Sequence, residues 1–438
     1  MTSIARTVAC KALIDWEKTK SDPHLIIAKQ SQCIKRSEDA AFTRELFFGV
    51  IKFKKKVDYF YRQYASIKST DLELRQILRL GYYQLIQTPN IPDYAVVSET
   101  VDLAKQFISL HKVGFVNAVM RAYLRKPDKV KFPNPQQNPV KFLGIEYSYP
   151  DWLVKRYLNR FGYNETVDIL KWGNTPPDFC FFINRYLSLE NNIELQLSKS
   201  NIQFEKSELF EGYYKCFNPY KLLRSKLFQK GLIVISDPAQ SISPSILAVP
   251  KGETALDLFA APGGKTAVLA GMADRDGCII AVDNSLKRLK ILKENILRWR
   301  LNNTFIICGN VLKFASGNKF RYILADVPCS GTGTIRRNAD LRWNLNEKRI
   351  KRNSEKQMLL IEQAAKMLSS KGRLVYSTCS IETEENFEII DNFLKQNNDF
   401  RLKHLDSFKN FERQPGIYEV IPHQHKSDGA FAAVIEKK

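Results

Sequence analysis

The chain of 438 residues has only five histidines, no Cys-x-x-Cys pair and no uninterrupted apolar stretch of about 18 residues. The eight cysteines are spread widely and are not clustered with histidine, which excludes a zinc site of ordinary spacing and a disulfide framework and predicts reduced thiols. The close pair His423 and His425 is expected to lie in an exposed loop, so we predict no metal site. A helix that crosses a bilayer needs about 20 apolar residues, so we expect no membrane-spanning helix.

The first residues also lack the apolar block and small-residue cleavage site of a secretory signal, because charges occur throughout them. We therefore expect a cytoplasmic protein, and we predict a monomer with no obligate protein partner.

What the chain has in excess is positive charge. It carries 67 Lys and Arg against 46 Asp and Glu, a formal charge of +21, of which residues 1–150 hold +10 and the remainder +11. A field of this sign attracts polyanions, which favours nucleic acid or an anionic membrane as the partner. A lysine-rich composition without any functional meaning is the alternative.

Residues 3–126 show the periodicity of amphipathic helices and predict an all-helical domain. Ser3 is expected to cap the first helix, and Gly114 to break the last pair. The other helices are expected at 41–64, 72–86, 95–108 and 115–124. The proline-rich segment 127–139 cannot sustain a helix or a strand and predicts a linker.

A small α+β module is expected next. Helices are predicted at 150–172 and 188–198, with short strands at 179–184, 202–204 and 213–217. The aromatic residues of these strands suit stacking on RNA bases and, equally well, the filling of a core.

From residue 231 short apolar strands alternate with helices, notably at 286–300 and 354–369. This pattern is typical of a doubly wound parallel sheet, which binds its ligands at the carboxyl ends of the strands. The strands are predicted at 232–236, 255–259, 278–283, 304–308, 321–326, 373–377 and 430–435.

The segment Leu256–Thr266 begins as a strand, passes through Ala-Ala-Pro-Gly-Gly and ends as a helix start. Small residues let the backbone approach a ligand, and helix amides attract electron-rich groups. A Walker A loop requires glycine where Phe259 stands, which disfavours an NTPase, and the dinucleotide-binding spacing is absent. The loop therefore suits a carboxylate or a small polar ligand.

Two further strand ends carry polar side chains that suit a nucleoside. The Asp283 carboxylate can accept both ribose hydroxyls, and Asn310, after the following strand, can contact an adenine edge. Together with the glycine-rich loop, these residues predict S-adenosylmethionine as the cofactor.

Two cysteines are also expected at this edge, in Asp326-Val-Pro-Cys329 and in Ser377-Thr-Cys379, whereas Cys10, Cys180 and Cys278 are expected to be buried and structural. A thiolate that adds to carbon 6 of cytosine makes carbon 5 able to attack a methyl donor. The carboxyl group of Asp326 can stabilise the developing charge through ring nitrogen 3. The spacing does not decide which thiol is the nucleophile and which assists product release.

The chain resembles the RsmB/Sun/Nop2 family of RNA cytosine-5 methyltransferases. The resemblance rests on DPAQS (237–241), FAAPGGKT (259–266), Asp283, ADVPCSGTGTIRR (325–337), Leu341-Arg342-Trp343, YSTCS (376–380) and DGAFAAVIEK (428–437). Segments within 78–121, including LRLGYYQLIQ, look like a NusB RNA-binding domain. Both domains together resemble the RsmB branch of the family, which implies a cytosine in 16S rRNA as the target. The motifs thus favour RNA as the partner, and we expect no membrane partner.

The resemblance implies that Cys379 is the nucleophile and that Cys329 assists release. It also assigns cofactor contacts. Taken with the residues predicted from the strand ends, the set is Phe259, Ala260, Ala261, Pro262, Gly263, Gly264, Lys265, Asp283, Asn310 and Asp326. The family usually has Asp where Asn310 stands, and DPAQS departs from the family's acidic form, so its residues receive no role.

We therefore predict three domains: a NusB-like helical RNA-binding domain (1–130), a linker helix with a small α+β RNA-recognition module (140–230), and a Rossmann-like methyltransferase domain (231–438). Lys52, Lys54, Lys55 and Lys56 either contact phosphate or form a solvated lysine run. Two other functions stay open: the same reaction on transfer RNA, and an RNA-binding transcription factor with an inactive catalytic domain.

Overall fold

The computed structural model describes residues 3–66, 71–187, 192–314, 317 and 319–438. The chain divides into two compact units. The first comprises Met1–Asn174 together with Asn338–Asn344, and the second comprises Thr175–Arg337 together with Leu345–Lys438. The chain therefore leaves the second unit after Arg337, contributes seven residues to the first unit, and returns at Leu345.

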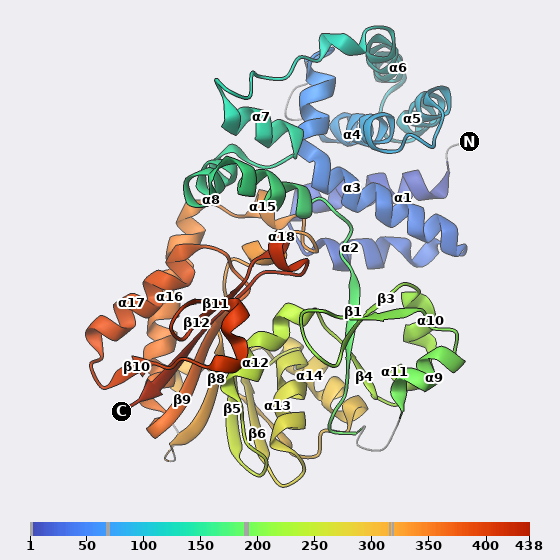
Figure 1. Ribbon diagram of the computed structural model, residues 1–438. Helices are drawn as coiled ribbons and strands as arrows, with labels where there is room; N and C mark the ends of the chain where they lie inside the picture. The colour runs from blue at the N-terminus through green and yellow to red at the C-terminus, as the bar shows by residue number, and fades with distance from the viewer. Residues whose placement is uncertain (1–2, 67–70, 188–191, 315–316, 318) are drawn as a thin grey trace. The chain divides into compact units, whose positions relative to one another are not determined.

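The first unit is all-helical, as predicted (Figure 1). Its helices pack their apolar faces into one core, in which Trp16, Phe47 and Tyr82 are almost completely buried. The α-helices of this unit are α1 (Ile4–Thr19), α2 (Pro23–Gln30), α3 (Ser37–Arg62), α4 (Leu72–Gln87), α5 (Asp93–Phe107), α6 (Leu110–Arg125), α7 (Pro139–Glu146), α8 (Asp151–Trp172) and α15 (Leu341–Asn344).

Three details of this unit differ from the sequence prediction. Gly114 lies inside α6 and does not break it, because nothing lies within 4 Å of its Cβ position and a solvated glycine costs a helix only about 1 kcal/mol. Ser3 precedes α1 but makes no capping bond, since its hydroxyl instead accepts a hydrogen bond from Arg6 Nη1 at 3.0 Å. The short helix α2 was not predicted.

The proline-rich segment forms one 3-10 turn, Pro127–Lys129, and then irregular chain up to Pro139, which begins α7. Helix α7 packs against α3 and α8. Residues 140–174 therefore lie in the first compact unit, whereas the sequence grouped them with the α+β module. The three predicted domain limits stay a prediction.

The lysine run of α3 does not behave as predicted by either alternative. Lys54 is enclosed by aromatic rings, with its ammonium group 4.8 Å from the Trp343 ring centroid, and burial lowers its pKa to about 8. The other three side chains have partners within the unit: Lys52 donates to the Asn174 carbonyl, Lys55 pairs with Asp151, and Lys56 pairs with Glu146. These four residues stabilise the packing of the first unit.

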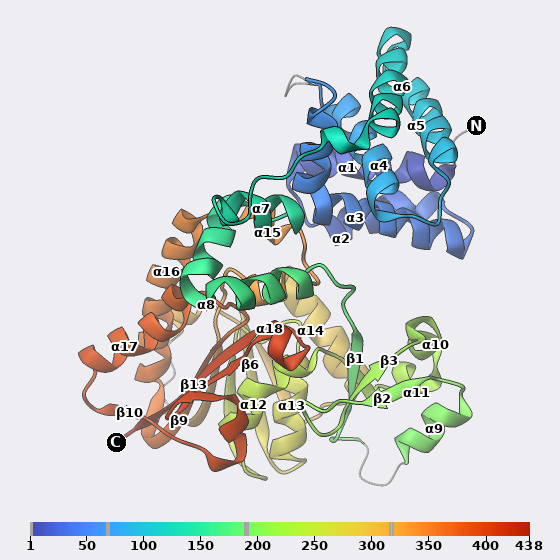
Figure 2. The same ribbon diagram turned by 45° about the horizontal axis from the view of Figure 1, so that its top comes forward.

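The second unit contains a small antiparallel sheet of order β2-β3-β1-β4, flanked by short helices (Figures 1 and 2). Strand β4 was predicted as part of the large sheet but pairs with β1, with Phe182 opposite Val234. The elements are β1 (Phe179–Ile183), α9 (Ile193–Lys199), β2 (Phe204–Lys206), β3 (Tyr213–Cys216), α10 (Pro219–Arg224), α11 (Lys226–Gln229) and β4 (Ile233–Ile235). The predicted helix start at Ser188 lies outside the described residues, and Asn192 caps α9 instead.

The aromatic residues of these strands fill a core. Phe181 and Tyr214 stack with ring centroids 5.3 Å apart and are buried, and so are Phe182 and Tyr213. Of the two alternatives that the sequence left open, core filling is confirmed for these four rings, whereas Phe217, at the end of the strand predicted at 213–217, lies after β3 and is exposed.

The larger sheet has the order β11-β12-β13-β9-β8-β5-β6-β7, with β10 beside β13. Strands β5 to β9 are parallel to one another, as predicted. Strands β13, β12, β11 and β10 each pair antiparallel with the neighbouring strand, so the sheet is mixed. The strands are β5 (Thr254–Leu258), β6 (Cys278–Asp283), β7 (Thr304–Cys308), β8 (Phe320–Asp326), β9 (Leu368–Thr378), β10 (Phe400–Leu402), β11 (Glu412–Gln414), β12 (Ile417–Val420) and β13 (Ala430–Lys437).

Helices cover both faces of this sheet, which makes the fold Rossmann-like. Leu269 of α13 and Leu292 of α14 belong to the core on one face, and Leu360 of α16 and Phe393 of α17 to the core on the other. The helices are α12 (Ile242–Leu247), α13 (Gly264–Ala273), α14 (Leu286–Trp299), α16 (Glu347–Lys366), α17 (Phe387–Gln396) and α18 (Pro422–His425). Helix α16 begins earlier than predicted and ends before Ser369, which lies in β9.

None of the helices in the described part of the chain is long and apolar enough to cross a membrane.

Candidate active site

The glycine-rich loop after β5 turns sharply. Phe259 has φ +66° and Gly263 has φ +110°, and α13 begins at Gly264. A Cβ atom at Gly263 would lie 2.7 Å from a methyl carbon of Leu292 in α14, so glycine is required for this close approach. Backbone bonds hold the loop at the sheet edge, including one from Ala260 N to Val282 O of 3.0 Å. The amides of the first turn of α13 provide the positive end of a helix dipole there.

Asp283 ends β6 and is 1% exposed. One carboxylate oxygen accepts from Ala261 N at 3.3 Å, and the other accepts from Ser285 N at 3.0 Å. Arg288 lies 3.2 Å from the first oxygen. The carboxylate is therefore held in a fixed orientation between the glycine-rich loop and the start of α14.

Asp326 ends β8 and is paired with a lysine of the glycine-rich loop. Lys265 Nζ donates to Asp326 Oδ1, and Ser377 Oγ of β9 donates to the same oxygen at 2.8 Å. The parallel register brings these groups together, because Asp326 and Ser377 are directly paired between β8 and β9. Both of these hydrogen bonds are to Oδ1.

The thiols of Cys329 and Cys379 meet just beyond the ends of these two strands. Their Sγ atoms lie 3.3 Å apart, and both side chains are partly buried. The hydrogen bond with Cys379, followed by burial, raises the pKa of Cys329 well above its ordinary value. Cys329 therefore keeps its proton and can donate it toward the sulfur of Cys379.

Glu385, which the sequence analysis missed, holds the Cys329 loop. Its carboxylate is buried and accepts from Ser330 N at 2.8 Å and from Ser330 Oγ at 2.5 Å. Asn353 of α16 donates to it at 2.9 Å. The acidic cluster after Cys379 contains Glu382, Glu384 and Glu385, and no sequence signal separates the one that binds the loop.

Gly333 lets the two cysteine loops approach each other. Its amide donates to the Cys379 carbonyl at 3.0 Å, and a Cβ atom there would lie 2.8 Å from that oxygen. The glycine of the motif after Cys329 is therefore required by contact with the second cysteine loop.

A second missed group ties three motifs together beside this edge. Arg337 pairs with Asp237 at 2.5 Å and with Asp428 at 2.7 Å, and both carboxylates are buried. Ser427 Oγ donates to Asp237 at 2.5 Å. The motif DPAQS, which received no role, thus anchors the segment after Cys329 to the start of β13.

A cavity of about 370 Å³ borders the glycine-rich loop. Among the predicted site residues, its lining includes Phe259, Ala260, Ala261, Pro262, Gly264, Lys265 and Asp326. Asp257 also lines it, and burial raises the pKa of that carboxyl to about 7. Gly263, Asp283, Asn310 and the two cysteines are not among its lining residues.

Asn310 follows β7 as predicted, and its side chain is exposed. Its carboxamide oxygen accepts from Leu312 N at 3.1 Å and caps a 3-10 turn. All eight cysteines are free thiols; Cys10 and Cys180 are buried as predicted, but Cys278 is only partly buried. Among the described residues there is no group of three or more His, Cys, Asp or Glu side chains that could hold a metal ion. His425 lies in the short helix α18, and its ring packs at a tilt against Phe411, with centroids 5.4 Å apart.

Comparison with known proteins identifies both parts of the chain. A family model described as 16S rRNA methyltransferase RsmB/F matches residues 244–436, and the model of the NusB family matches residues 3–125. The probable ribosomal RNA small subunit methyltransferase B of Bacillus subtilis is 29% identical, over 99% of this chain and 98% of its own. The protein of the same name from Synechocystis is 30% identical, over 91% of each chain.

Solved structures agree with these matches. The crystal structure of PH0851 covers 100% of both chains with a TM-score of 0.82 and 27% identity. A methyltransferase homologue protein from Pyrococcus horikoshii covers 70% of this chain and 100% of its own, with a TM-score of 0.61 and 27% identity.

Proposed function

This chain belongs to the RsmB/F family of 16S rRNA methyltransferases, and from that membership we propose that it methylates carbon 5 of one cytosine in 16S rRNA. The observation that carries the proposal is the thiol pair Cys329 and Cys379, 3.3 Å apart, beside the carboxylate of Asp326. A pair of thiols and a carboxylate at the ligand edge of a Rossmann-like sheet suits base methylation through a covalent adduct.

We propose S-adenosylmethionine as the methyl donor, and the geometry of the loop fits it. The cavity of about 370 Å³ beside the glycine-rich loop provides space for a ligand, and the Asp283 carboxylate is fixed at the adjacent strand end. Residues Phe259 to Lys265 and Asp283 would hold the cofactor, with Asn310 at the adenine end. When bound, S-adenosylmethionine supplies an electrophilic methyl group.

In the proposed reaction the thiolate of Cys379 adds to carbon 6 of the target cytosine. A bond forms between sulfur and carbon 6, and electron density moves to carbon 5, which would take the methyl group from S-adenosylmethionine and release S-adenosylhomocysteine. A base then removes the carbon-5 proton, the bond between sulfur and carbon 6 breaks, and Cys379 leaves as a thiolate. The raised pKa of Cys329 makes it the thiol that keeps its proton, so it can stabilise that leaving thiolate by hydrogen bonding.

Asp326 is the residue that we assign to cytosine nitrogen 3. The bonds from Lys265 and Ser377 fix its carboxyl group at the end of β8, three residues before Cys329. With a proton on Oδ2, this carboxyl group would donate a hydrogen bond to nitrogen 3 and stabilise the negative charge that develops on the ring, which lowers the barrier to addition. The cytosine must leave its base stack to reach this edge, as the targets of other base-modifying enzymes do.

The RNA substrate is supported by the charge of +21 and by the NusB family match over residues 3–125. The monomeric state and the cytoplasmic location stay predictions.

Methylation of in vitro transcribed 16S rRNA with labelled S-adenosylmethionine, mapped by mass spectrometry, tests the proposal. We expect a single 5-methylcytosine. If transfer RNA is methylated in a parallel reaction and 16S rRNA is not, the substrate is transfer RNA and the proposed chemistry stays the same. If calorimetry detects no binding of S-adenosylmethionine, the result favours an RNA-binding protein without catalytic activity.

A further inference from the structure

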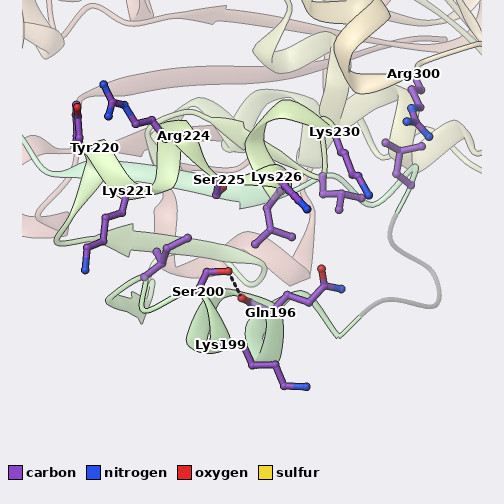
Figure 3. Close-up of a pocket in the computed structure, with 14 residues that line it drawn as sticks. Gln196, Lys199, Ser200, Tyr220, Lys221, Arg224, Ser225, Lys226, Lys230 and Arg300 are labelled. Atoms are coloured by element: carbon purple, nitrogen blue, oxygen red, sulfur yellow. Dashed lines mark hydrogen bonds between the residues drawn. The ribbon is translucent and has the colours of Figure 1, made fainter.

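A strongly basic pocket lies in the second unit, outside the candidate active site. It is formed by α9, α10 and α11 of the small α+β module together with the end of α14, and its volume is about 790 Å³ (Figure 3). This volume lies within the range of about 300–1,000 Å³ that is typical of ligand sites. None of the residues assigned to the cofactor or to cytosine is among its lining residues.

Six cationic side chains line this pocket: Lys199, Lys221, Arg224, Lys226, Lys230 and Arg300. All six are exposed, and no aspartate or glutamate is among the described lining residues. Within the described part of the chain none of the six has an ion pair, whereas lysines elsewhere in the module do, such as Lys206 with Glu194. No acidic side chain among the described residues therefore neutralises the positive charge of the pocket.

The pocket also carries an exposed aromatic ring. Tyr220 of α10 is 60% exposed, and the Arg224 guanidinium lies 3.9 Å from its ring centroid. Figure 3 shows these two side chains together at one end of the pocket, near Lys221. Phe217, just before α10, is 53% exposed. These rings differ from the strand aromatics Phe181, Phe182, Tyr213 and Tyr214, which are buried, so packing in the core does not account for them.

We propose that this pocket binds the phosphodiester backbone of a single-stranded segment of the RNA substrate, with one base stacked on Tyr220. Several unpaired cations around one pocket suit the phosphates of an RNA strand, and an exposed ring beside them suits an unstacked base, which a double helix does not offer. The inference rests on the proposed function only in taking RNA as the substrate. It assigns RNA contact to the helical side of the small module and not to its strands.

The triple variant Lys221→Ala/Arg224→Ala/Lys226→Ala tests the proposal in the full-length chain. We expect its affinity for labelled single-stranded oligouridylate to fall at least tenfold at low salt. We also expect the slope of log K against log salt to decrease by about 2, because each lost contact to single-stranded RNA removes about 0.7. With 16S rRNA as substrate, KM should rise at least tenfold while kcat at saturating RNA stays unchanged.

The matched control is Lys251→Ala/Lys366→Ala/Lys395→Ala, which removes the same charge from exposed lysines elsewhere in the second unit. It should leave the slope and the KM near those of the parent. Lys221→Arg/Lys226→Arg keeps the charge and should also keep the slope, which separates lost contacts from a disturbed module. Tyr220→Phe should bind oligouridylate as the parent does, and Tyr220→Ala about tenfold more weakly.

Equal losses in the pocket variant and in the control would overturn the proposal. So would complete displacement of oligouridylate by millimolar inorganic phosphate, because that result describes a site for a small anion. Binding of oligouridylate does not require methylation, so this test stands even if 16S rRNA proves not to be methylated at cytosine.

Discussion

Cys329 Sγ lies 3.3 Å from Cys379 Sγ, although 50 residues separate the two in the chain. The contact follows from the sheet, since β8 and β9 are adjacent parallel strands and the two cysteines come directly after their carboxyl ends. Two loops of unrelated sequence therefore place their thiols together, and the buried carboxylate of Glu385 fixes one of those loops.

The first prediction concerns that carboxylate. Glu385→Gln should lower the free energy of unfolding by about 1–3 kcal/mol, because charge-assisted bonds to Ser330 are weakened in a buried position. Methylation should fall more than stability alone explains, since the Cys329 loop loses its anchor. Urea unfolding and initial rates measure the two effects, and the exposed Glu388→Gln is the control. Equal activity of both variants would show that the anchor does not matter.

A second prediction concerns Asp283. Its carboxylate is oriented by two backbone amides, so Asp283→Asn should weaken the binding of S-adenosylmethionine about 10- to 100-fold in calorimetry. Asn310→Ala should weaken it only a few fold, because the Asn310 side chain is exposed and caps its own turn. The reverse order of the two effects would contradict the assignment of Asp283 to the cofactor.

A third prediction concerns pH. Burial raises the pKa of Asp257 to about 7 in the folded chain, against about 3.9 when unfolded. The folded state therefore keeps a proton that the unfolded state loses, and this contribution to stability is present below pH 4 and disappears as the pH rises through 7. Relative to Asp257→Asn, the parent should lose up to about 4 kcal/mol between pH 4 and pH 8.

Urea unfolding at pH 4, 6 and 8 measures this difference, and Asp276→Asn, at an exposed position of the same unit, is the control. A difference between parent and Asp257→Asn that does not vary with pH would show that Asp257 is ionised in the folded chain throughout.

A fourth prediction concerns Arg342, which the family resemblance included among the methyltransferase motifs but which lies buried in the first unit. Its guanidinium donates to the Ser148 carbonyl at 3.2 Å and to Asn174 Oδ1 at 2.9 Å, and it stacks over the Tyr149 ring. Arg342→Ala leaves buried acceptors without a donor and creates a cavity, so it should cost about 3 kcal/mol or more. Differential scanning calorimetry measures the loss, with the exposed Arg352→Ala as control.

An unchanged binding of S-adenosylmethionine by Arg342→Ala, at a temperature where it remains folded, would agree with a structural role. A loss of cofactor binding in the folded variant would contradict that role.

Most of the fold was predictable because local signals and tertiary structure agree. Strand β6 matches the predicted range 278–283, and the loop at Gly263 lies between β5 and α13 as expected. Parallel strands present their carboxyl ends at one edge of a sheet. The sequence alone therefore places Asp283, Asp326 and Cys379 on the same side of the sheet.

The rest depended on long-range contacts that no local pattern records. Strands β10, β11 and β12 are only three or four residues long. They form because β10 and β12 pair with β13 and β11 pairs with β12. The lysines of α3 look solvated in sequence, yet Lys54 packs against Trp343, nearly 300 positions away. The role of Glu385 likewise depends on Ser330, which reaches it only once β8 and β9 are paired.

The central claim is the division of labour between the two thiols, and covalent capture of RNA tests it most directly. Each variant is incubated with 16S rRNA and S-adenosylmethionine, and adducts that survive denaturation are counted on a gel. We predict that Cys379→Ala neither methylates nor captures RNA, whereas Cys329→Ala accumulates a stable adduct because release fails. An adduct formed by Cys379→Ala, and none by Cys329→Ala, would contradict the account and reverse the two roles.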